Sequence, residues 1–213
     1  MKNVINQLVE ELDKDTSTGV FRFSPLQYAG QLDKSPFLRA IVSKAKVLGI
    51  PCEPYKWERA CNKSVVIDHE TVEPFPLGQG QDIDNLYNHG MSCVSEAVFM
   101  LLTKLNLIEG KNITIVGRGH SVKNLAETLL AHNATVTIAH SGTKSLIHST
   151  AGQNVVIYAT PTLIQSVAYD TMDLVIDLGN CVPRKDLFSC PCVDNIGRLT
   201  ISVLMNRHAT GGI

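Results

Sequence analysis

Apolar and polar residues follow a regular pattern in the second half of the chain, and this pattern predicts strands that alternate with helices. Nearly continuous runs of Val, Ile and Ala predict strands over residues 111–116, 134–139, 154–159 and 174–178. Amphipathic stretches predict helices over residues 93–105, 121–131, 145–150 and 196–207. Strands that are apolar throughout are typical of a parallel sheet covered by helices on both faces. We therefore expect an α/β fold.

The first 90 residues are less regular and predict a smaller α/β lobe. Apolar residues at positions 4, 5, 8, 9 and 12 form one helical stripe. Ser35 and Pro36 are residue types that begin a helix, and Gly49 is one that ends it. Residues 51–55 and 64–67 have the composition of short strands, and the stretch 73–88, with two prolines and two glycines, predicts a loop.

Composition and charge narrow the range of partners. The chain has 213 residues, with 19 Lys and Arg against 20 Asp and Glu, which gives a net charge of −1. This balance argues against a polyanion-binding surface, so we expect no nucleic-acid partner. No apolar run approaches the roughly 18 residues of a membrane span, and the N-terminus is acidic and amphipathic. We expect a soluble, cytoplasmic protein without membrane contact.

The six cysteines predict reduced thiols. They lie at positions 52, 61, 93, 181, 190 and 192. Only Cys190 and Cys192 are close in sequence, and one residue separates them, whereas paired zinc ligands are usually separated by about two to four. We therefore expect no metal site. Cys93 has the position of a core thiol at a helix start.

A turn with two glycines follows the first predicted strand of the parallel sheet. Gly117 and Gly119 lie between that strand and a helix, with Arg118, His120 and Ser121 beside them. Glycines at such a turn allow backbone N–H groups to approach a pyrophosphate, which indicates a Rossmann-type dinucleotide site. The third glycine of the usual motif is absent, so a tight turn without a ligand is the alternative.

The end of the next strand favours NADP over NAD. A domain that prefers NAD presents an Asp or Glu about 20 residues after the glycines. This chain has His140, Ser141, Thr143 and Lys144 there instead, with Arg118 nearby. Cations and hydroxyl donors suit a 2′-phosphate. The alternative for His140 and Lys144 is an ordinary solvated loop.

Several motifs in order along the chain resemble the bifunctional methylenetetrahydrofolate dehydrogenase/cyclohydrolase family. They are the Gly110-Lys111 pair before a strand, Gly117-Arg118, the stretch 134–144, Ser-Cys-Val-Ser at 92–95, Asp-Ile-Asp at 82–84, Val-Ile-Asp-Leu-Gly at 175–179 and Ile-Gly-Arg-Leu-Thr at 196–200. The resemblance covers residues 35–207. Asp177 within it has two interpretations, a cofactor contact or a residue that fixes the following turn.

The resemblance implies a domain organisation, a cofactor site and partners. It implies a folate-type lobe over residues 1–90, a Rossmann-type NADP-binding domain over 91–195, and a helix over 196–213 that returns across the cleft. It adds Thr160, Gly197 and Thr200 to the expected cofactor contacts, and Asp84, Phe37, Asp194 and Asn195 to the expected substrate side. A folate-type substrate and a homodimer are implied as well. The alternative for Asp84 is a helix cap or a turn carboxylate.

The chain departs from the family at the positions that act on folate. Phe37 stands where the family has a tyrosine, and Ile41 stands where it has a proton-transferring lysine. Another register would bring Lys44 or Lys46 to that role. Asp194 and Asn195 replace a pair of glycines. No confident catalytic residue remains, and an Ile41→Lys variant is expected to regain some cyclohydrolase turnover.

The sequence therefore predicts an NADP-dependent oxidoreductase of one-carbon folate metabolism that resembles methylenetetrahydrofolate dehydrogenase and has lost the cyclohydrolase step. Hydride transfer needs the two reactants held face to face, because the cofactor carries the chemistry. The alternatives are a catalytically silent paralogue that binds a dinucleotide or folate as a sensor or partner subunit, and a dehydrogenase of another small substrate.

Overall fold

The computed structural model describes residues 1–16, 23–25, 36–50, 64–66, 84–85, 90–165, 167–169 and 172–210. Contacts divide the chain into two compact units. One contains Met1–Asn6 and Gly90–Gly197, and the other contains Gln7–His89 and Arg198–Ile213. The division lies close to the predicted boundaries at residues 90 and 195, but it assigns the first six residues to the Rossmann-type unit.

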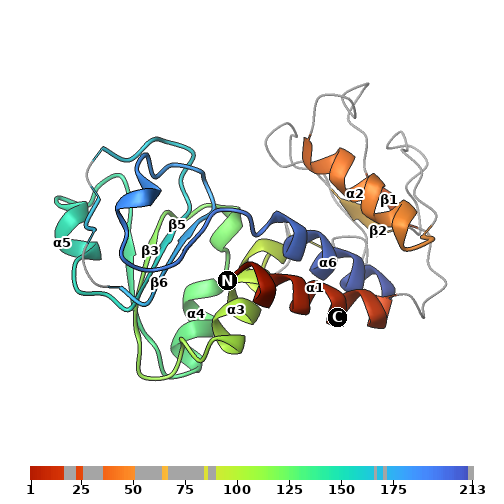
Figure 1. Cartoon of the computed structure of the whole chain (residues 1–213), viewed down its shortest axis with the longest axis horizontal. Coiled ribbons are helices and arrows are strands. Elements are labelled where there is room, and N and C mark those ends of the chain that lie inside the picture. Colours follow the sequence, from red (N-terminus) through yellow and green to blue (C-terminus); the bar gives the residue numbers. More distant parts are fainter. Residues whose placement is uncertain are drawn as a thin grey trace. The chain divides into compact units, whose positions relative to one another are not determined.

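The first unit is built on a parallel five-stranded sheet (Figure 1). Its strands are β3 (Asn112–Val116), β4 (Thr135–Ala139), β5 (Val155–Tyr158), β6 (Leu174–Asp177) and β7 (Cys192–Val193). Their order is β4-β3-β5-β6-β7, and each neighbouring pair is parallel. The predicted α/β class is confirmed, and β7 is a short edge strand that the apolar pattern did not predict.

Helices and short turns precede and connect these strands. They are α3 (Cys93–Lys104), α4 (Leu125–Ala131), α5 (Leu146–Thr150) and the 3₁₀ turns η2 (His120–Val122) and η3 (Lys185–Leu187). Helices α3 and α4 pack against each other. The segment 121–131, predicted as one helix, is divided into η2 and α4 because Asn124 between them has the left-handed φ of 57°.

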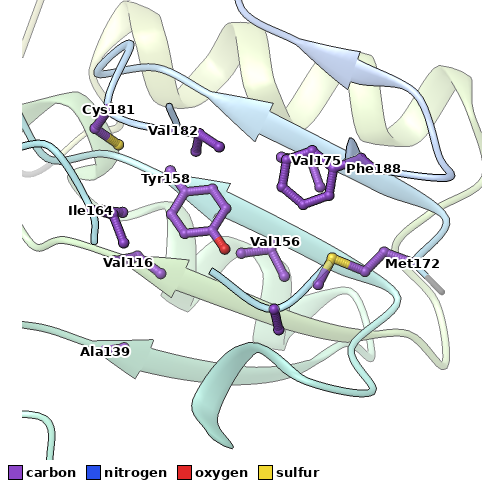
Figure 2. Close-up of a cluster of buried hydrophobic side chains, with 11 residues drawn as sticks. Val116, Ala139, Val156, Tyr158, Ile164, Met172, Val175, Cys181, Val182 and Phe188 are labelled. Atoms are coloured by element: carbon purple, nitrogen blue, oxygen red, sulfur yellow. The ribbon is translucent and has the colours of Figure 1, made fainter. Parts of the chain in front are cut away.

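The sheet interior is apolar, as parallel strands require. Every residue of β5 and β6 is buried, and so are Ile113 to Val116 of β3. A cluster of buried side chains packs beside the sheet, with the Tyr158 ring among Val116, Val156 and Ile164 (Figure 2). Burial raises the pKa of Tyr158 to about 12, so its side chain is a neutral core group at physiological pH.

In its described residues, the second unit contains the whole of one helix, most of two others and a two-stranded sheet. Most of α1 (Lys2–Thr16) and α6 (Gly197–Ala209) belongs to it, together with α2 (Pro36–Val47), β1 (Phe23–Pro25) and β2 (Ser64–Val66). β1 and β2 pair in parallel. The predicted strand at 51–55 and most of the predicted loop at 73–88 lie outside the described residues.

An ion pair joins the helices of the second unit. The Asp13 carboxylate accepts a hydrogen bond from Lys44 Nζ through one oxygen and from Ser202 Oγ, at 3.0 Å, through the other. These residues come from α1, α2 and α6, so both ends of the chain contribute to this unit. Among the described residues, no helix is long and apolar enough to cross a membrane.

Candidate cofactor site

A cavity of about 750 Å³ opens at the carboxyl ends of β3, β4 and β5. Its lining comes from three segments that directly follow these strands: residues 116–119, 140–147 (Gly142 excepted) and 159–165. In the sheet, β4 lies on one side of β3 and β5 lies on the other. The connections from β3 therefore run in opposite directions across the sheet, and the reversal lies between β3 and β5. Ligands of open α/β sheets bind at such a switch point. The topology therefore places the cavity where a dinucleotide would bind.

The glycine turn forms the floor of this cavity. Gly117 has φ of +124°, and a Cβ atom there would lie 2.3 Å from the carbonyl oxygen of Ala159. Only glycine fits this close approach between two chain segments. A Cβ atom on Gly119 would meet no protein atom within 4 Å, so the space beside Gly119 is open. The fold thus requires one of the two glycines, and the other is open to the cavity. This arrangement suits a turn whose backbone N–H groups bind a phosphate.

The loop after β4 carries polar side chains into the cavity wall. His140 N–H donates to Thr143 Oγ1 at 2.9 Å, and Thr143 N–H donates to the His140 carbonyl at 2.8 Å, which closes a tight turn. Gly142 N–H donates to His140 Nδ1 at 3.1 Å, so the neutral ring carries its proton on Nε2. His140, Ser141 and Lys144 are exposed, and so is Arg118 in the glycine turn, which also lines the cavity.

Apolar side chains cover another part of the wall. Ile147 and Leu163 are 43% and 61% exposed, and both line the cavity with Leu146 and Ile164. Exposed aliphatic side chains in a concave site offer a surface for a flat apolar ring. The cavity therefore combines an apolar wall, a cationic and hydroxyl-rich wall, and a glycine floor.

Most of the predicted cofactor contacts come together in this cavity. Its lining includes Gly117, Arg118, Gly119, His140, Ser141, Thr143 and Thr160. His120 lines a neighbouring cavity of about 300 Å³, together with Lys123 and the glycine turn itself. The Ser121 carbonyl accepts a hydrogen bond from Ser95. Neither cavity is lined by Gly197, which is exposed, or by Thr200, which is buried in α6.

Sequence reasoning missed part of the wall. The stretch 161–165, after β5, and residues 145–147, at the start of α5, line the cavity but were not predicted. Thr160-Pro161 at the end of a buried strand was the available signal, because the carboxyl ends of neighbouring parallel strands meet at one edge of the sheet.

The predicted substrate residues do not line this cavity. Asp194 pairs with Lys185 at 3.3 Å, and Asn195 is exposed. Ile41 is fully buried in the second unit, and Asp84 is half-buried there. Phe37 lies in α2, and its side chain is outside the described part of the structure. Their roles in binding a substrate stay predictions.

The carboxylate of Asp177 fixes a turn. It accepts hydrogen bonds from the N–H groups of Cys181 and Val182 at 2.9 and 3.2 Å, and it is completely buried. Burial, followed by the Asp177 charge, raises the pKa of the Cys181 thiol to about 12. Of the two interpretations of Asp177, these contacts support the fixed turn.

Residues 92–188 match the protein family described as tetrahydrofolate dehydrogenase/cyclohydrolase, NAD(P)-binding domain. The Rossmann-type domain of this chain belongs to the tetrahydrofolate dehydrogenase/cyclohydrolase family. The resemblance that the sequence motifs predicted is confirmed. The match contains the glycine turn, the loop after β4 and all residues that line the larger cavity.

Curated members of the family are similar to this chain over part of their length. The bifunctional protein FolD of Clostridium beijerinckii is 37% identical over 135 residues, which cover 55% of this chain and 48% of the relative. FolD of Shouchella clausii is 29% identical over 166 residues, which cover 70% of this chain and 59% of the relative. The chain spans about half the length of the curated relatives it matches.

Solved structures of family members share the fold. A 5,10-methylenetetrahydrofolate dehydrogenase from the silkworm Bombyx mori superposes with a TM-score of 0.77 and 18% identity, covering 99% of this chain and 96% of that one. The bifunctional enzyme FolD of Campylobacter jejuni gives a TM-score of 0.75 and 16% identity over the same shares. At these identities the likeness establishes the fold.

Proposed function

We propose that the chain is an NADP-dependent oxidoreductase of one-carbon folate metabolism, of the methylenetetrahydrofolate dehydrogenase type. One observation carries the proposal: the cavity at the switch point of a family NAD(P)-binding domain has a cationic wall without a carboxylate. A related FolD structure from Trypanosoma brucei contains NADP, and a related yeast dehydrogenase is NAD-dependent. The choice between the two cofactors therefore depends on the side chains of this chain.

The loop after β4 supports NADP. An Asp or Glu at this place accepts hydrogen bonds from the ribose hydroxyls of NAD and repels a 2′-phosphate. Among the described residues that line the cavity there is no Asp or Glu, while Arg118 and Lys144 supply positive charge. Ser141 and His140 add hydrogen-bond donors. These four groups can bind a phosphate at the edge of the cavity, with the glycine turn left for the pyrophosphate.

The cofactor supplies the hydride chemistry when it is bound. In this proposal, the residues of the chain hold and orient it. The backbone N–H of Gly119 would bind the pyrophosphate, and Ile147 and Leu163 would supply an apolar surface for a ring of the cofactor. A domain that only positions the reactants is sufficient for hydride transfer.

The proposal includes the loss of the cyclohydrolase step. That step needs a group that moves protons at the substrate carbon. Ile41 has no such group, and it is fully buried. Lys44, the alternative on the same helix, has its ammonium group in an ion pair with Asp13. The proposal also includes a folate-type substrate, a cytoplasmic location and a homodimer.

Titration calorimetry with NADP and NAD tests the cofactor assignment. We expect NADP to bind more tightly than NAD. Ser141→Glu adds a carboxylate at the cavity wall. It should weaken the binding of NADP by about tenfold or more in Kd, while the binding of NAD stays unchanged or becomes tighter. Thr137→Glu is the matched control, because Thr137 is exposed on β4 but does not line the cavity.

Turnover tests the reaction. With the cofactor bound, methylenetetrahydrofolate should reduce NADP, and methenyltetrahydrofolate should not be hydrolysed above the uncatalysed rate. Dinucleotide binding without turnover would favour the silent paralogue. An absence of binding by either dinucleotide would contradict the proposal.

A further inference from the structure

Two buried serines connect α3 to the turn that follows the glycines. Ser92 precedes α3 as its N-cap, and its Oγ accepts a hydrogen bond from the Ser95 N–H at 3.1 Å. Ser92 Oγ in turn donates to Ser95 Oγ at 3.0 Å, and Ser95 Oγ donates to the Ser121 carbonyl at 3.3 Å. Both serine side chains are fully buried.

The direction of these hydrogen bonds is fixed by the number of protons. Each hydroxyl has one proton to donate. Ser95 uses its proton on the Ser121 carbonyl, so Ser95 Oγ is the acceptor for Ser92. The serines therefore form a one-way relay that ends on the backbone of η2. If Ser95 lost its hydroxyl, the part-buried Ser121 carbonyl and the buried Ser92 hydroxyl would each lose a partner, and a buried group is costly to leave unpaired.

The turn that receives this relay is not capped by the side chains at its two helix starts. Gly119, the N-cap of η2, makes no capping hydrogen bond, and neither does the side chain of Asn124, the N-cap of α4. Within η2, Val122 N–H donates to the Gly119 carbonyl at 3.1 Å. The peptide group that joins Ser121 to Val122 is planar, so a bond to its carbonyl also orients its N–H. Ser95 thus acts on the same peptide that closes the turn at Gly119.

We propose that Ser95 is a positioning residue for the dinucleotide: its hydroxyl holds the glycine turn in the conformation that receives the pyrophosphate. This inference rests on the proposed function for its ligand. Ser95 does not line the cavity, so its effect on binding passes through Ser121. If the turn is already ordered in the unliganded protein, binding of the dinucleotide does not lose the conformational entropy of ordering it.

Ser95→Ala tests this role, with Ser202→Ala as the matched control. Ser202 is also fully buried, and its Oγ donates a hydrogen bond to Asp13 in the second unit, whereas Ser95 Oγ both donates and accepts one. Both variants lose the same atom, and both should lower Tm. Only Ser95→Ala should weaken the binding of NADP, by about tenfold in Kd. Ser95→Cys keeps a weaker donor and should recover part of the affinity.

Hydrogen exchange of the unliganded protein provides an independent readout. In Ser95→Ala, the amides of residues 119–123 should exchange about tenfold faster, with no such change in Ser202→Ala. Equal Kd values for the two variants, or exchange that rises evenly across the domain, would overturn the proposal. If the wild-type protein binds no dinucleotide, the proposed function fails, and the exchange data alone decide whether Ser95 holds the turn.

Discussion

The ammonium group of Lys185 lies 3.1 Å from the carboxylate of Asp177, which is completely buried at the end of β6. The same ammonium group contacts Asn180 Oδ1 at 2.7 Å and the Asp194 carboxylate at 3.3 Å. One side chain on η3 therefore connects the ends of β6 and β7. Asp194, which the family resemblance assigned to the substrate side, is part of this ion-pair network.

Lys185→Met should destabilise the protein by about 2 kcal/mol, because the buried Asp177 charge keeps its backbone donors but loses its cation. Arg184→Met is the control. Arg184 pairs with Asp186 at 2.9 Å, but both side chains are more than 60% exposed, and such pairs contribute about 0–1 kcal/mol. Urea unfolding of both variants measures the difference. If both variants lost the same free energy of unfolding, the Lys185 charge would not stabilise the buried Asp177 carboxylate.

Gly117→Ala and Gly119→Ala should separate folding from binding. At Gly117 a Cβ atom would collide with the Ala159 carbonyl at 2.3 Å, so we expect a loss of stability of about 3 kcal/mol or more. At Gly119 a Cβ atom would meet nothing in the protein within 4 Å, so Tm should stay within a few degrees. Calorimetry should then show weaker NADP binding by Gly119→Ala, because the added methyl group occupies the ligand's space. Unchanged affinity would place the pyrophosphate elsewhere.

Ile41→Lys should unfold the second unit instead of restoring cyclohydrolase turnover, which reverses the expectation from the sequence. Ile41 is 0% exposed, and an unpaired charge in that place should cost about 4 kcal/mol or more. Ile41→Met, which keeps the volume, should cost less than about 1.5 kcal/mol. Circular dichroism melting curves distinguish the variants. A folded and active Ile41→Lys protein would contradict the burial of this position.

Stability should fall at alkaline pH. Burial, with the Asp177 charge as the next cause, raises the pKa of the Cys181 thiol from 9.0 to about 12. Below pH 9 the thiol is protonated in the folded and in the unfolded protein, so its contribution to the free energy of unfolding is fully present. As the pH rises toward 12, the unfolded chain loses the thiol proton first, and the free energy of unfolding therefore decreases.

Cys181→Ser tests the source of that decrease. A serine hydroxyl can still donate to Asp177 but does not titrate in this range, so the decline above pH 9 should be shallower than in the wild type. Tyr158, whose pKa burial raises from 10.0 to about 12, should account for part of the remaining decline. Urea unfolding at several pH values gives the measurement. Identical slopes for wild type and variant would exclude the Cys181 thiol.

The parallel sheet could be predicted from the sequence because its strands are apolar on both faces. The β-branched runs of β3, β5 and β6 have no other stable place than a sheet covered by helices. The short edge strand β7 has two residues and no comparable run, so its pairing depends on β6 beside it. Asn124 looked compatible with a continuous helix, yet it adopts the left-handed conformation that ends η2 and precedes α4.

The sequence by itself determined the alternation of β3, β4, β5 and β6 with helical segments, the glycine turn and the carboxylate-free loop after β4, because each depends on residues that are neighbours in the chain. Only the tertiary structure decided which side chains meet. It brought residues 161–165 to the cavity wall, placed Ile41 in a core, and turned Ser95 toward Ser121, 26 residues away. Burial and hydrogen bonding between distant segments depend on how the elements pack, and the local pattern of apolar and polar residues does not specify that packing.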